Sequence, residues 1–336
     1  MSTVFIGTSQ FAAAVLERLA RSDAHRPALV ITRPDRPSGR GRRLSAPPVA
    51  SAARALGLAL EQPQNVNDEH TGALIAGALA ATPAAGGHPA GGTVVVCAFG
   101  ALIKEPLLSR HELLNVHPSL LPRWRGAAPV ERAIIAGDRQ TGVSIMRLTA
   151  GLDSGPVCLA GAEPIRPDDT YGSLAARLQA LGGELIGRAL DQRPPFVEQP
   201  EEGVTYAEKL TAEDRLLDPR RPAVELERVV RALHPHVGAR VQLADGSMLG
   251  VHEAALVEAG EPAGRGLHAA GEPGRDEPAC EERAPGLTAR DGRLLLQCTP
   301  GALELTLVQP AGGRAMDAAA YLRGHAPFGG GPPGRA

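Results

Sequence analysis

The sequence lacks the features that mark disulfide-rich, zinc-binding, secreted or membrane proteins. Its four cysteines, Cys97, Cys158, Cys280 and Cys298, stand far apart and form no CxxC pair, so neither a disulfide framework nor a zinc site is indicated. No apolar run approaches the roughly 18 residues that a membrane-spanning helix needs. Residues 1–16 carry neither a basic region nor a cleavage signature. We therefore expect a cytoplasmic protein with reduced thiols, no metal and no membrane partner.

Lysine is also nearly absent. Of the 35 basic residues only Lys104 and Lys209 are lysines, and the formal net charge is -2. A chain this close to neutrality gives no global sign of affinity for nucleic acid, so any contact with RNA has to come from a local patch. Because the chain is also rich in Ala, Gly and Pro, the arginine excess resembles codon bias and lowers the weight of any single arginine cluster.

The first half of the chain alternates short apolar runs with helical patterns. A length of 336 residues with 43% hydrophobic residues allows two domains. Alternation of this kind predicts an α/β domain over residues 1–190, with a doubly wound, mostly parallel sheet of the Rossmann type. The expected strands are 3–6, 28–32, 58–61, 93–99, 113–117, 142–148 and 157–160, and the expected helices are one capped by Ser9, then 48–56, 68–81 and 171–190.

Beyond residue 190 the pattern changes. Residues 191–206 are rich in Pro and Glu without periodicity, which predicts a linker. Residues 207–327 predict a second domain, a small OB-like β-barrel, and 328–336 a disordered tail. Residues 82–92 and 259–285 are expected to be mobile insertions. The expected elements of the second domain are a helix at 223–233, β-runs around 241–257 and 293–308, and tight hairpins at Asp245-Gly246 and Asp291-Gly292.

The most informative pair of residues is Asn115 and His117. They stand two positions apart in the expected strand 113–117, so both side chains leave the same face near its carboxyl end, where open α/β sheets bind ligands. Pro118 ends the strand directly afterwards. An amide donor beside an imidazole suits acyl transfer, because the tetrahedral intermediate carries an oxyanion that needs a preorganised donor. A lone Asn-x-His is more often structural, so a third residue has to support this interpretation.

Asp153 is the candidate for that third residue. It lies in the loop Gly151–Pro156 between two expected strands, and the flanking glycines free the backbone to fold back towards His117. A carboxylate beside a histidine favours the imidazolium and fixes its tautomer, which suits a group that transfers protons. We expect Asn115, His117 and Asp153 to form one constellation, although Asp153 taken alone would be an ordinary turn residue.

These stretches resemble the signature of the 10-formyltetrahydrofolate-dependent formyltransferases. The resemblance is carried by Asn115-x-His117-x-Ser119-Leu120-Leu121-Pro122, followed by Asp153-Ser154-Gly155, and covers most of the chain up to about residue 258 except the insertions. It implies that 10-formyltetrahydrofolate is the co-substrate and that no metal takes part. The catalytic residues that it implies are Asn115, His117 and Asp153, and the folate segment is Ser119, Leu120, Leu121 and Pro122.

The acceptor is indicated by four further features, which resemble the subfamily that formylates methionyl-tRNA. They are the run Arg125–Pro129, the basic loop Thr32–Arg43, the junction Val204–Lys209 and the additional C-terminal domain, a fold that commonly binds RNA. The resemblance implies transfer to the α-amino group of initiator methionyl-tRNA, giving N-formylmethionyl-tRNA for translation initiation. We also expect a monomer.

The basic loop also suits RNA on its own composition. Between residues 32 and 43 five arginines oppose Asp35, a local charge of +4 with interspersed Gly and Pro. Such a loop is expected to be flexible and to contact phosphates, although an arginine-biased solvated loop is the alternative. Trp124 can stack on a base, but a lone tryptophan more often packs. The expected tRNA contacts are Arg36, Arg40, Arg42, Arg43 and Lys209.

Four other functions remain open at this point. A formyltransferase acting on glycinamide ribonucleotide normally lacks a second domain of this size, and one acting on an amino sugar nucleotide has no use for the basic loop. A nicotinamide-dependent dehydrogenase is disfavoured because Phe5–Gln10 holds one glycine and no GxGxxG, and because no acidic residue closes the next strand at Ile31. An RNA-binding protein with a vestigial catalytic domain is disfavoured by the intact trio.

Overall fold

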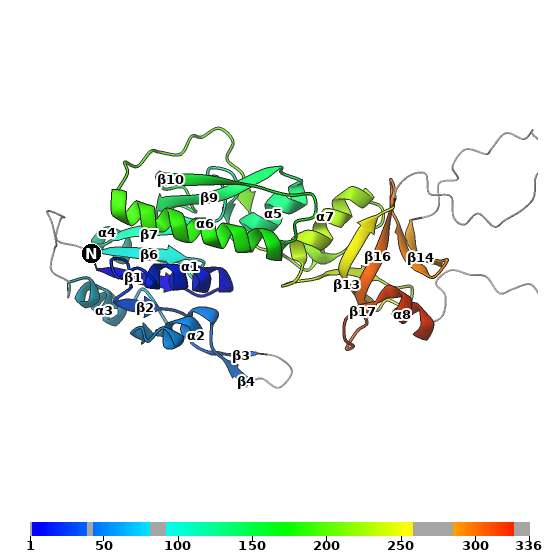
Figure 1. Ribbon diagram of the computed structural model, residues 1–336, viewed down its shortest axis with the longest axis horizontal. Coiled ribbons are helices and arrows are strands. Elements are labelled where there is room, and N and C mark those ends of the chain that lie inside the picture. Colours follow the sequence, from blue (N-terminus) through cyan, green and yellow to red (C-terminus); the bar gives the residue numbers. More distant parts are fainter. Residues whose placement is uncertain (1, 39–42, 81–91, 258–284, 326–336) are drawn as a thin grey trace, which may run out of the picture. The chain divides into compact units, whose positions relative to one another are not determined.

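The computed structural model describes residues 2–38, 43–80, 92–257 and 285–325 (Figure 1). The expected insertions at 82–92 and 259–285 fall almost entirely outside these ranges, as do the tail 328–336 and the predicted tRNA contacts Arg40 and Arg42. Contacts along the chain define two units. The first comprises Met1–Ala133, Asp138–Pro167 and Ser173–Lys209, and the second Ile134–Gly137, Asp168–Gly172 and Leu210–Ala336.

The first unit is built on one sheet whose strands follow the order β10-β9-β7-β6-β1-β2-β5. Five of them run parallel, and β9 and β10 are antiparallel additions at one edge. This confirms the predicted α/β fold class with a mostly parallel sheet. The strands are β1 (Thr3–Gly7), β2 (Leu29–Ile31), β5 (Leu60–Glu61), β6 (Thr93–Cys97), β7 (Glu112–His117), β9 (Gln140–Arg147) and β10 (Val157–Pro164).

The antiparallel edge follows from the length of a connection. Only residues 148–156 join β9 to β10, and a parallel pair needs a crossover of about a dozen residues or more. The chain therefore turns back on itself, which places Asp153 in a short loop at the end of β9. Helix α5 (Pro129–Ala136) lies between β7 and β9 in the chain and was not predicted from the sequence.

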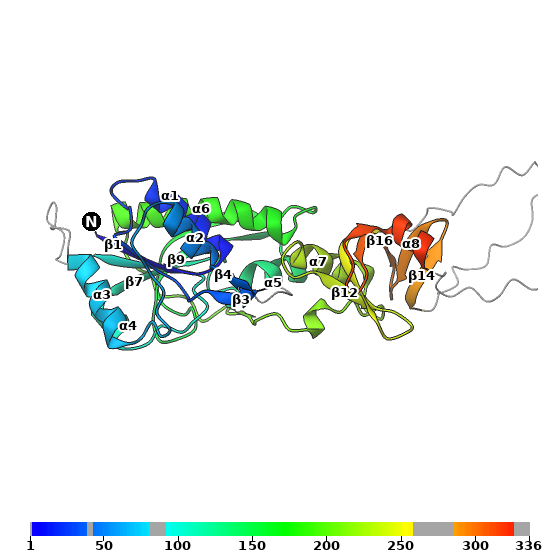
Figure 2. The same ribbon diagram turned by 90° about the horizontal axis from the view of Figure 1, so that it is seen from below.

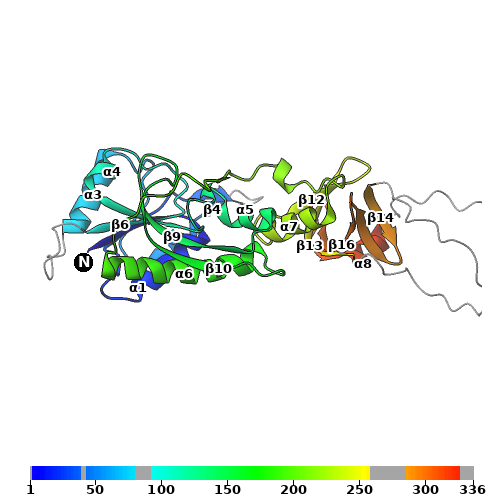
Figure 3. The ribbon, with the colours of Figure 1, turned by 90° about the horizontal axis from the view of Figure 1, so that it is seen from above.

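Helices cover both faces of this sheet. Figures 2 and 3 show α1 (Gln10–Ala20) and α6 (Tyr171–Gln192) on one side and α3 (Glu69–Ala80) and α4 (Leu107–Arg110) on the other, while α2 (Pro48–Ala55) packs beside α1. Burial of apolar side chains on both faces explains why the central strands are continuous apolar runs. The core beneath α3 and α4 contains Val4, Ile6, Ile31, Ile75, Leu79, Val94, Val96 and Leu107.

The turn from β1 into α1 has two local requirements. The Ser9 hydroxyl accepts a hydrogen bond from the Ala12 amide at 3.3 Å, which is the predicted N-cap. A Cβ at Gly7 would lie 2.8 Å from the Cys97 carbonyl oxygen, so the residue that ends β1 must be glycine for β6 to approach. Gly7 therefore allows β1 and β6 to pack closely.

The ends of the basic loop are more ordered than expected. Arg36–Ser38 (β3) and Arg43–Ser45 (β4) pair as antiparallel strands, with Arg36 opposite Ser45. The sequence did not predict this pairing, which satisfies backbone groups that would otherwise need water. Residues 39–42 lie outside the described ranges.

The second unit is an antiparallel sheet that curls into a half-barrel (Figure 1). Its path is β12-β13-β16-β15-β14, with β17 paired to β16. Both predicted Asp-Gly hairpins are present, with positive φ at Gly246, Asp291 and Gly292. The elements are η1 (Glu213–Arg215), α7 (Ala223–Leu233), β12 (Ala239–Gln242), β13 (Met248–Leu256), β14 (Gly286–Arg290), β15 (Arg293–Gln297), β16 (Ala302–Gln309), β17 (Met316–Asp317) and α8 (Ala318–Gly324).

The half-barrel has its own core. Leu226 and Leu233 from α7 pack with Leu249, Leu294 and Leu305 from the strands, and all five are fully buried. The amphipathic pattern of α7 matches the predicted helix at 223–233. Within the described residues, no helix has the length and apolar character required to cross a bilayer.

Candidate active site

Strand β7 places Asn115 and His117 at the carboxyl edge of the sheet. Asn115 lies between Val96 of β6 and Met146 of β9, and His117 lies opposite Ser144 of β9. Both residues are buried, with 8% and 4% of their surface exposed. The alternation of the strand therefore brings the amide and the imidazole to one face, as their spacing predicted.

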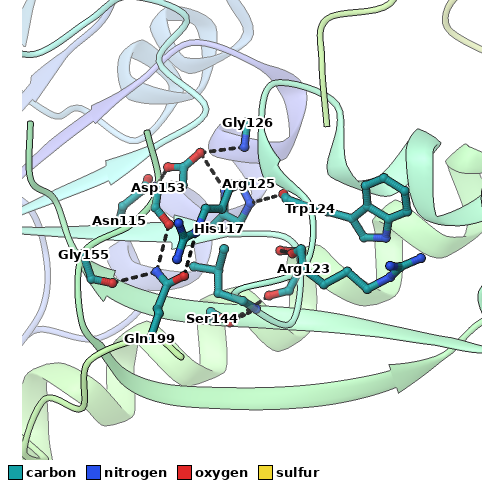
Figure 4. A network of polar contacts seen from close by, with 12 residues as sticks. Asn115, His117, Arg123, Trp124, Arg125, Gly126, Ser144, Asp153, Gly155 and Gln199 are labelled. Carbon is teal, nitrogen blue, oxygen red and sulfur yellow. Dashed lines mark hydrogen bonds and ion pairs between the residues drawn. The ribbon is translucent and has the colours of Figure 1, made fainter. Parts of the chain in front are cut away.

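Asp153 reaches both of them from the β9–β10 loop (Figure 4). Its Oδ1 accepts a hydrogen bond from Asn115 Nδ2 at 3.3 Å, and its Oδ2 lies 3.6 Å from His117 Nδ1. Asp153 adopts a φ of 44°, in the left-handed region that aspartate tolerates better than most residues. At Gly155 a Cβ would lie 2.0 Å from the Arg147 carbonyl oxygen, so this glycine lets the loop close against β9.

The contact of His117 Nε2 with a backbone carbonyl shows that this ring nitrogen is a hydrogen-bond donor. His117 Nε2 lies 2.8 Å from the backbone carbonyl oxygen of Trp124. A carbonyl has no proton to donate, so the contact requires that Nε2 carries one. His117 Nδ1 lies 3.6 Å from Asp153 Oδ2, which is longer than a hydrogen bond. Nδ1 is therefore available to contact a reacting atom.

Trp124 is held in place by Asp138. The indole Nε1 donates to Asp138 Oδ2 at 2.8 Å, and Trp124 itself has a φ of 62°. Arg123 donates two hydrogen bonds to the same carboxylate at 2.7 and 2.8 Å and lies 4.3 Å over the indole ring. Hydrogen bonding to Asp138 raises the pKa of Arg123. Trp124 is thus half-buried, and its side chain contacts Asp138 and Arg123.

The segment Ser119–Pro122 is fixed to β9 by a single hydroxyl. Ser144 Oγ donates to the Ser119 carbonyl at 2.8 Å and accepts the Leu121 amide at 3.1 Å. Ser119 is itself fully buried, and its hydroxyl donates to the Arg123 carbonyl at 2.6 Å. Leu120, Leu121 and Pro122 are half-buried. Ser119 therefore shapes the segment from within, and the other three residues present the partly exposed surface.

A short pairing of strands connects the site to the residues near 206. Arg125–Gly126 (β8) pairs in parallel with Tyr206–Ala207 (β11). The Gly126 amide donates to Asp153 Oδ2 at 2.9 Å. Gly126 has a φ of 121°, and a Cβ there would lie 2.8 Å from the Ala207 carbonyl oxygen, so only glycine fits. The predicted junction motif around Tyr206 is therefore a structural partner of the candidate site.

Gln199 is a site residue that the sequence reading did not single out. Its Nε2 donates to the carbonyl oxygens of Asp153 and Gly155, and its Oε1 accepts from Arg125 Nε (Figure 4). It lies in the expected linker 191–206, where no periodicity suggested a role. Ser144 was also missed, although a polar residue inside a buried apolar strand is a signal that could have found it.

A separate cavity of about 540 Å³ lies where β1 and β6 end. This is the point at which the order of the parallel strands reverses, a common ligand position in open sheets. Four of its lining residues, Arg33, Pro34, Arg36 and Pro37, belong to the basic loop, while Asn115, His117 and Asp153 do not line it. The Lys209 side chain is exposed, and Arg43 contributes its backbone to β4. Among the described residues, no group of three potential metal-ligating side chains occurs.

Fold and site together define a class. A mostly parallel α/β sheet with an amide, an imidazole and a carboxylate at the carboxyl end of one strand is suited to transferring an acyl-type group. The chain belongs to the formyl transferase family. The family model described as Formyl transferase matches residues 1–190, and the one described as Formyl transferase, C-terminal domain, matches residues 209–326.

Relatives and solved structures agree with this membership. A protein of Halorhodospira halophila named methionyl-tRNA formyltransferase is 41% identical over 332 residues, covering 96% of this chain and 95% of its own. The structure of HypX from Aquifex aeolicus in complex with tetrahydrofolic acid has a TM-score of 0.57 at 16% identity, covering 95% of this chain and 46% of that chain. Methionyl-tRNA formyltransferase from Clostridium thermocellum has a TM-score of 0.56 at 13% identity, covering 77% and 95%. The two structural likenesses show the fold.

Proposed function

We propose that the protein transfers a formyl group from 10-formyltetrahydrofolate to the α-amino group of initiator methionyl-tRNA, giving N-formylmethionyl-tRNA for translation initiation. The observation that carries this proposal is the convergence of Asn115, His117 and Asp153 in one buried site. The name of the 41% identical relative, which this chain matches over nearly its whole length, supports methionyl-tRNA as the acceptor.

The folate donor is supported by the surface beside the trio. Leu120, Leu121 and Pro122 offer half-buried apolar groups of the kind that pack against flat heterocyclic rings. Their position relative to His117 is fixed from inside the protein by Ser119 and Ser144. A solved neighbour of the same fold is described in complex with tetrahydrofolic acid, which supports a folate in the family.

Asn115 and His117 would stabilise the developing negative charge. In the proposed reaction the α-nitrogen attacks the formyl carbon, a new C–N bond forms, and the formyl oxygen becomes an oxyanion. The Asn115 amide has two N–H groups and uses one for Asp153, which leaves a second to donate to this oxygen. When His117 is protonated at both nitrogens, its Nδ1–H is the further donor, because the 3.6 Å separation from Asp153 is not a hydrogen bond.

Asp153 would transfer the proton from the attacking amine to the leaving folate nitrogen. The attacking α-amine, with a pKa near 8, is partly neutral at neutral pH and becomes cationic once it has attacked. Asp153 accepts the proton that this nitrogen loses and returns a proton to the folate nitrogen as the old C–N bond breaks. The Gly126 amide and the Asn115 amide keep the carboxylate oxygens in place through both steps.

The basic loop and Lys209 are the proposed contacts to tRNA. Arg36 is exposed on β3 and lines the cavity with Arg33, so phosphates of an acceptor end entering there would meet guanidinium groups. Lys209 is exposed as well. Arg40, Arg42 and Arg43 complete the proposed set on the basis of the sequence resemblance, and Arg40 and Arg42 lie outside the described residues.

A competition assay tests the proposal. The protein is incubated with 10-formyltetrahydrofolate and equal concentrations of initiator methionyl-tRNA, glycinamide ribonucleotide and an amino sugar nucleotide, with a sample lacking acceptor to measure donor hydrolysis. We expect formyl incorporation into methionyl-tRNA to exceed the other two by orders of magnitude. Preferential formylation of either small acceptor would overturn the assignment of substrate, and no transfer to any acceptor would overturn the assigned activity.

A further inference from the structure

We propose that Gln199 is a positioning residue for Asp153: its carboxamide ties the Asp153 loop to the segment that carries Arg125 and Gly126. The proposal rests on the proposed function for its kinetic consequences and on hydrogen bonding for its structural ones. Gln199 is half-buried and belongs to the segment between α6 and β11, outside every motif that the sequence reading identified.

Both N–H groups and the oxygen of the carboxamide form hydrogen bonds. Nε2 donates to the Asp153 carbonyl at 2.8 Å and to the Gly155 carbonyl at 2.7 Å. Oε1 accepts from Arg125 Nε at 2.9 Å. An arginine only donates and a carbonyl only accepts, so turning the amide over would break all three contacts. The orientation of Gln199 is therefore determined by its partners.

The Asp153 loop needs such an anchor. Asp153 has a φ of 44°, and Gly151 and Leu152 beside it are exposed, with 60% of the Leu152 surface accessible. Few apolar contacts therefore hold this turn in its shape, and the location of its carboxylate depends on hydrogen bonds to its backbone. Gln199 supplies two of them, one to Asp153 itself.

The same side chain also aligns the groups that meet the carboxylate. Arg125 is buried, with 9% exposed, and precedes Gly126, whose amide donates to Asp153 Oδ2. Gln199 thus connects Arg125, which precedes the donor Gly126, with Asp153, whose carboxylate accepts that hydrogen bond. Three segments far apart in the sequence meet at one amide, as Figure 4 shows. A displacement of about 1 Å at such a position can cost roughly 10²-fold in rate.

Gln199→Glu is the sharpest test because it keeps the shape of the side chain. The new carboxylate can still accept from Arg125, but it would face two carbonyl oxygens that now lie 2.7 and 2.8 Å from Nε2. Repulsion would push the Asp153 loop away. Gln192→Glu is the matched control, since it makes the same chemical change at the exposed end of α6.

We expect Gln199→Glu, in the full chain, to lower kcat by about 10²-fold while KM for the donor and for tRNA changes less than about twofold. Gln192→Glu should match the wild type. In an Asp153→Ala background, adding Gln199→Glu should cost little further activity, because its effect passes through Asp153. The positioning role would be overturned if Gln199→Glu lowered kcat by the same factor with and without Asp153→Ala. A rise in KM with kcat unchanged would also overturn it.

Hydrogen exchange separates this proposal from the proposed function. Gln199→Glu should speed exchange of the Gly126 amide, which is protected by Asp153 Oδ2, while exchange in the central strands β1 and β6 stays unchanged. If the wild type formylates no methionyl-tRNA but this exchange pattern holds, the proposed function fails and the anchoring of Asp153 stands. Unchanged exchange at Gly126, or faster exchange throughout the sheet, would overturn the anchoring.

Discussion

Trp124 donates its indole Nε1–H to Asp138 at 2.8 Å, and the backbone carbonyl of the same residue lies 2.8 Å from His117 Nε2. Asp138 therefore holds the tryptophan whose backbone carbonyl contacts the His117 ring. The positive φ of Trp124 makes this backbone conformation costly without support, and the bidentate pair of Arg123 with Asp138 provides further support. The carbonyl that fixes the imidazole is itself positioned by a carboxylate 14 residues away in sequence.

Removing that carboxylate should be visible by fluorescence as well as by activity. Asp138→Ala frees the indole, and Trp124 is the chain's single tryptophan, so its emission should shift to the red and kcat should fall by about 10-fold or more. Asp23→Ala, at an exposed position, is the control and should change neither. An unchanged emission spectrum with full activity would show that Asp138 does not hold Trp124 in solution.

Loss of the trio itself should affect chemistry far more than folding. We expect His117→Ala and Asp153→Asn to reduce kcat by about 10²- to 10⁴-fold, because His117 stabilises the oxyanion and Asp153 transfers the proton in the proposed reaction. Thermal unfolding should show the variants still folded. His70→Ala, on the exposed side of α3, serves as the control for His117→Ala. Near-normal turnover in either trio variant would remove that residue from the proposed mechanism.

Local signals explain why much of the fold could be predicted. The Ser9 cap, the amphipathic face of α7 and the hairpins at Gly246 and Gly292 each depend on a few neighbouring residues, and each is present. The convergence of Asn115, His117 and Asp153 could be predicted from strand alternation and flanking glycines. In these cases the residue types and their spacing determine the geometry.

The residues that support the trio could not be found in the same way. Gln199 contacts partners 44 to 74 residues away, and its surroundings in the sequence have no periodicity. The pairing of β3 with β4 depends on backbone hydrogen bonds, for which an arginine-rich loop gives no signal. The antiparallel direction of β10 follows from loop length, which becomes informative only once both strands are known to be neighbours.

The basic loop should carry a measurable part of the salt dependence. We expect Arg40→Ala combined with Arg42→Ala to weaken tRNA use and to make the slope of log K against log salt shallower by up to about 1.8, since each phosphate contact contributes about 0.9. Folate binding and donor hydrolysis should not change. Arg21→Ala with Arg110→Ala removes the same charge at exposed positions elsewhere. An identical change in slope for both pairs would assign the effect to net charge alone.

Replacing Ser144 should destabilise the protein and weaken binding of the folate donor. Ser144→Ala leaves the Ser119 carbonyl and the Leu121 amide without their partner, at a cost of about 1–3 kcal/mol in unfolding free energy, and should raise KM for the donor. Thr141→Val on the same strand is the matched control: in the described part of the chain its buried hydroxyl has no hydrogen-bond partner. Chemical denaturation should therefore separate the two variants. Equal stability losses would contradict the bridging role of Ser144.

Cys97, Cys158 and Cys298 should resist alkylation in the folded protein. Burial raises the pKa of Cys298 to about 11 and also raises the pKa of Cys97 and Cys158. The thiolate is the reactive form, so at pH 8 Cys298 should react on the order of 10²-fold more slowly than a thiol with a pKa near 8.5, and its rate should rise about tenfold per pH unit up to about pH 10. Mass spectrometry after timed iodoacetamide labelling, with a guanidinium-unfolded sample as control, measures each site. Cys298 labelling as fast in the native protein as in the unfolded one would show that this core opens far more often than its burial implies.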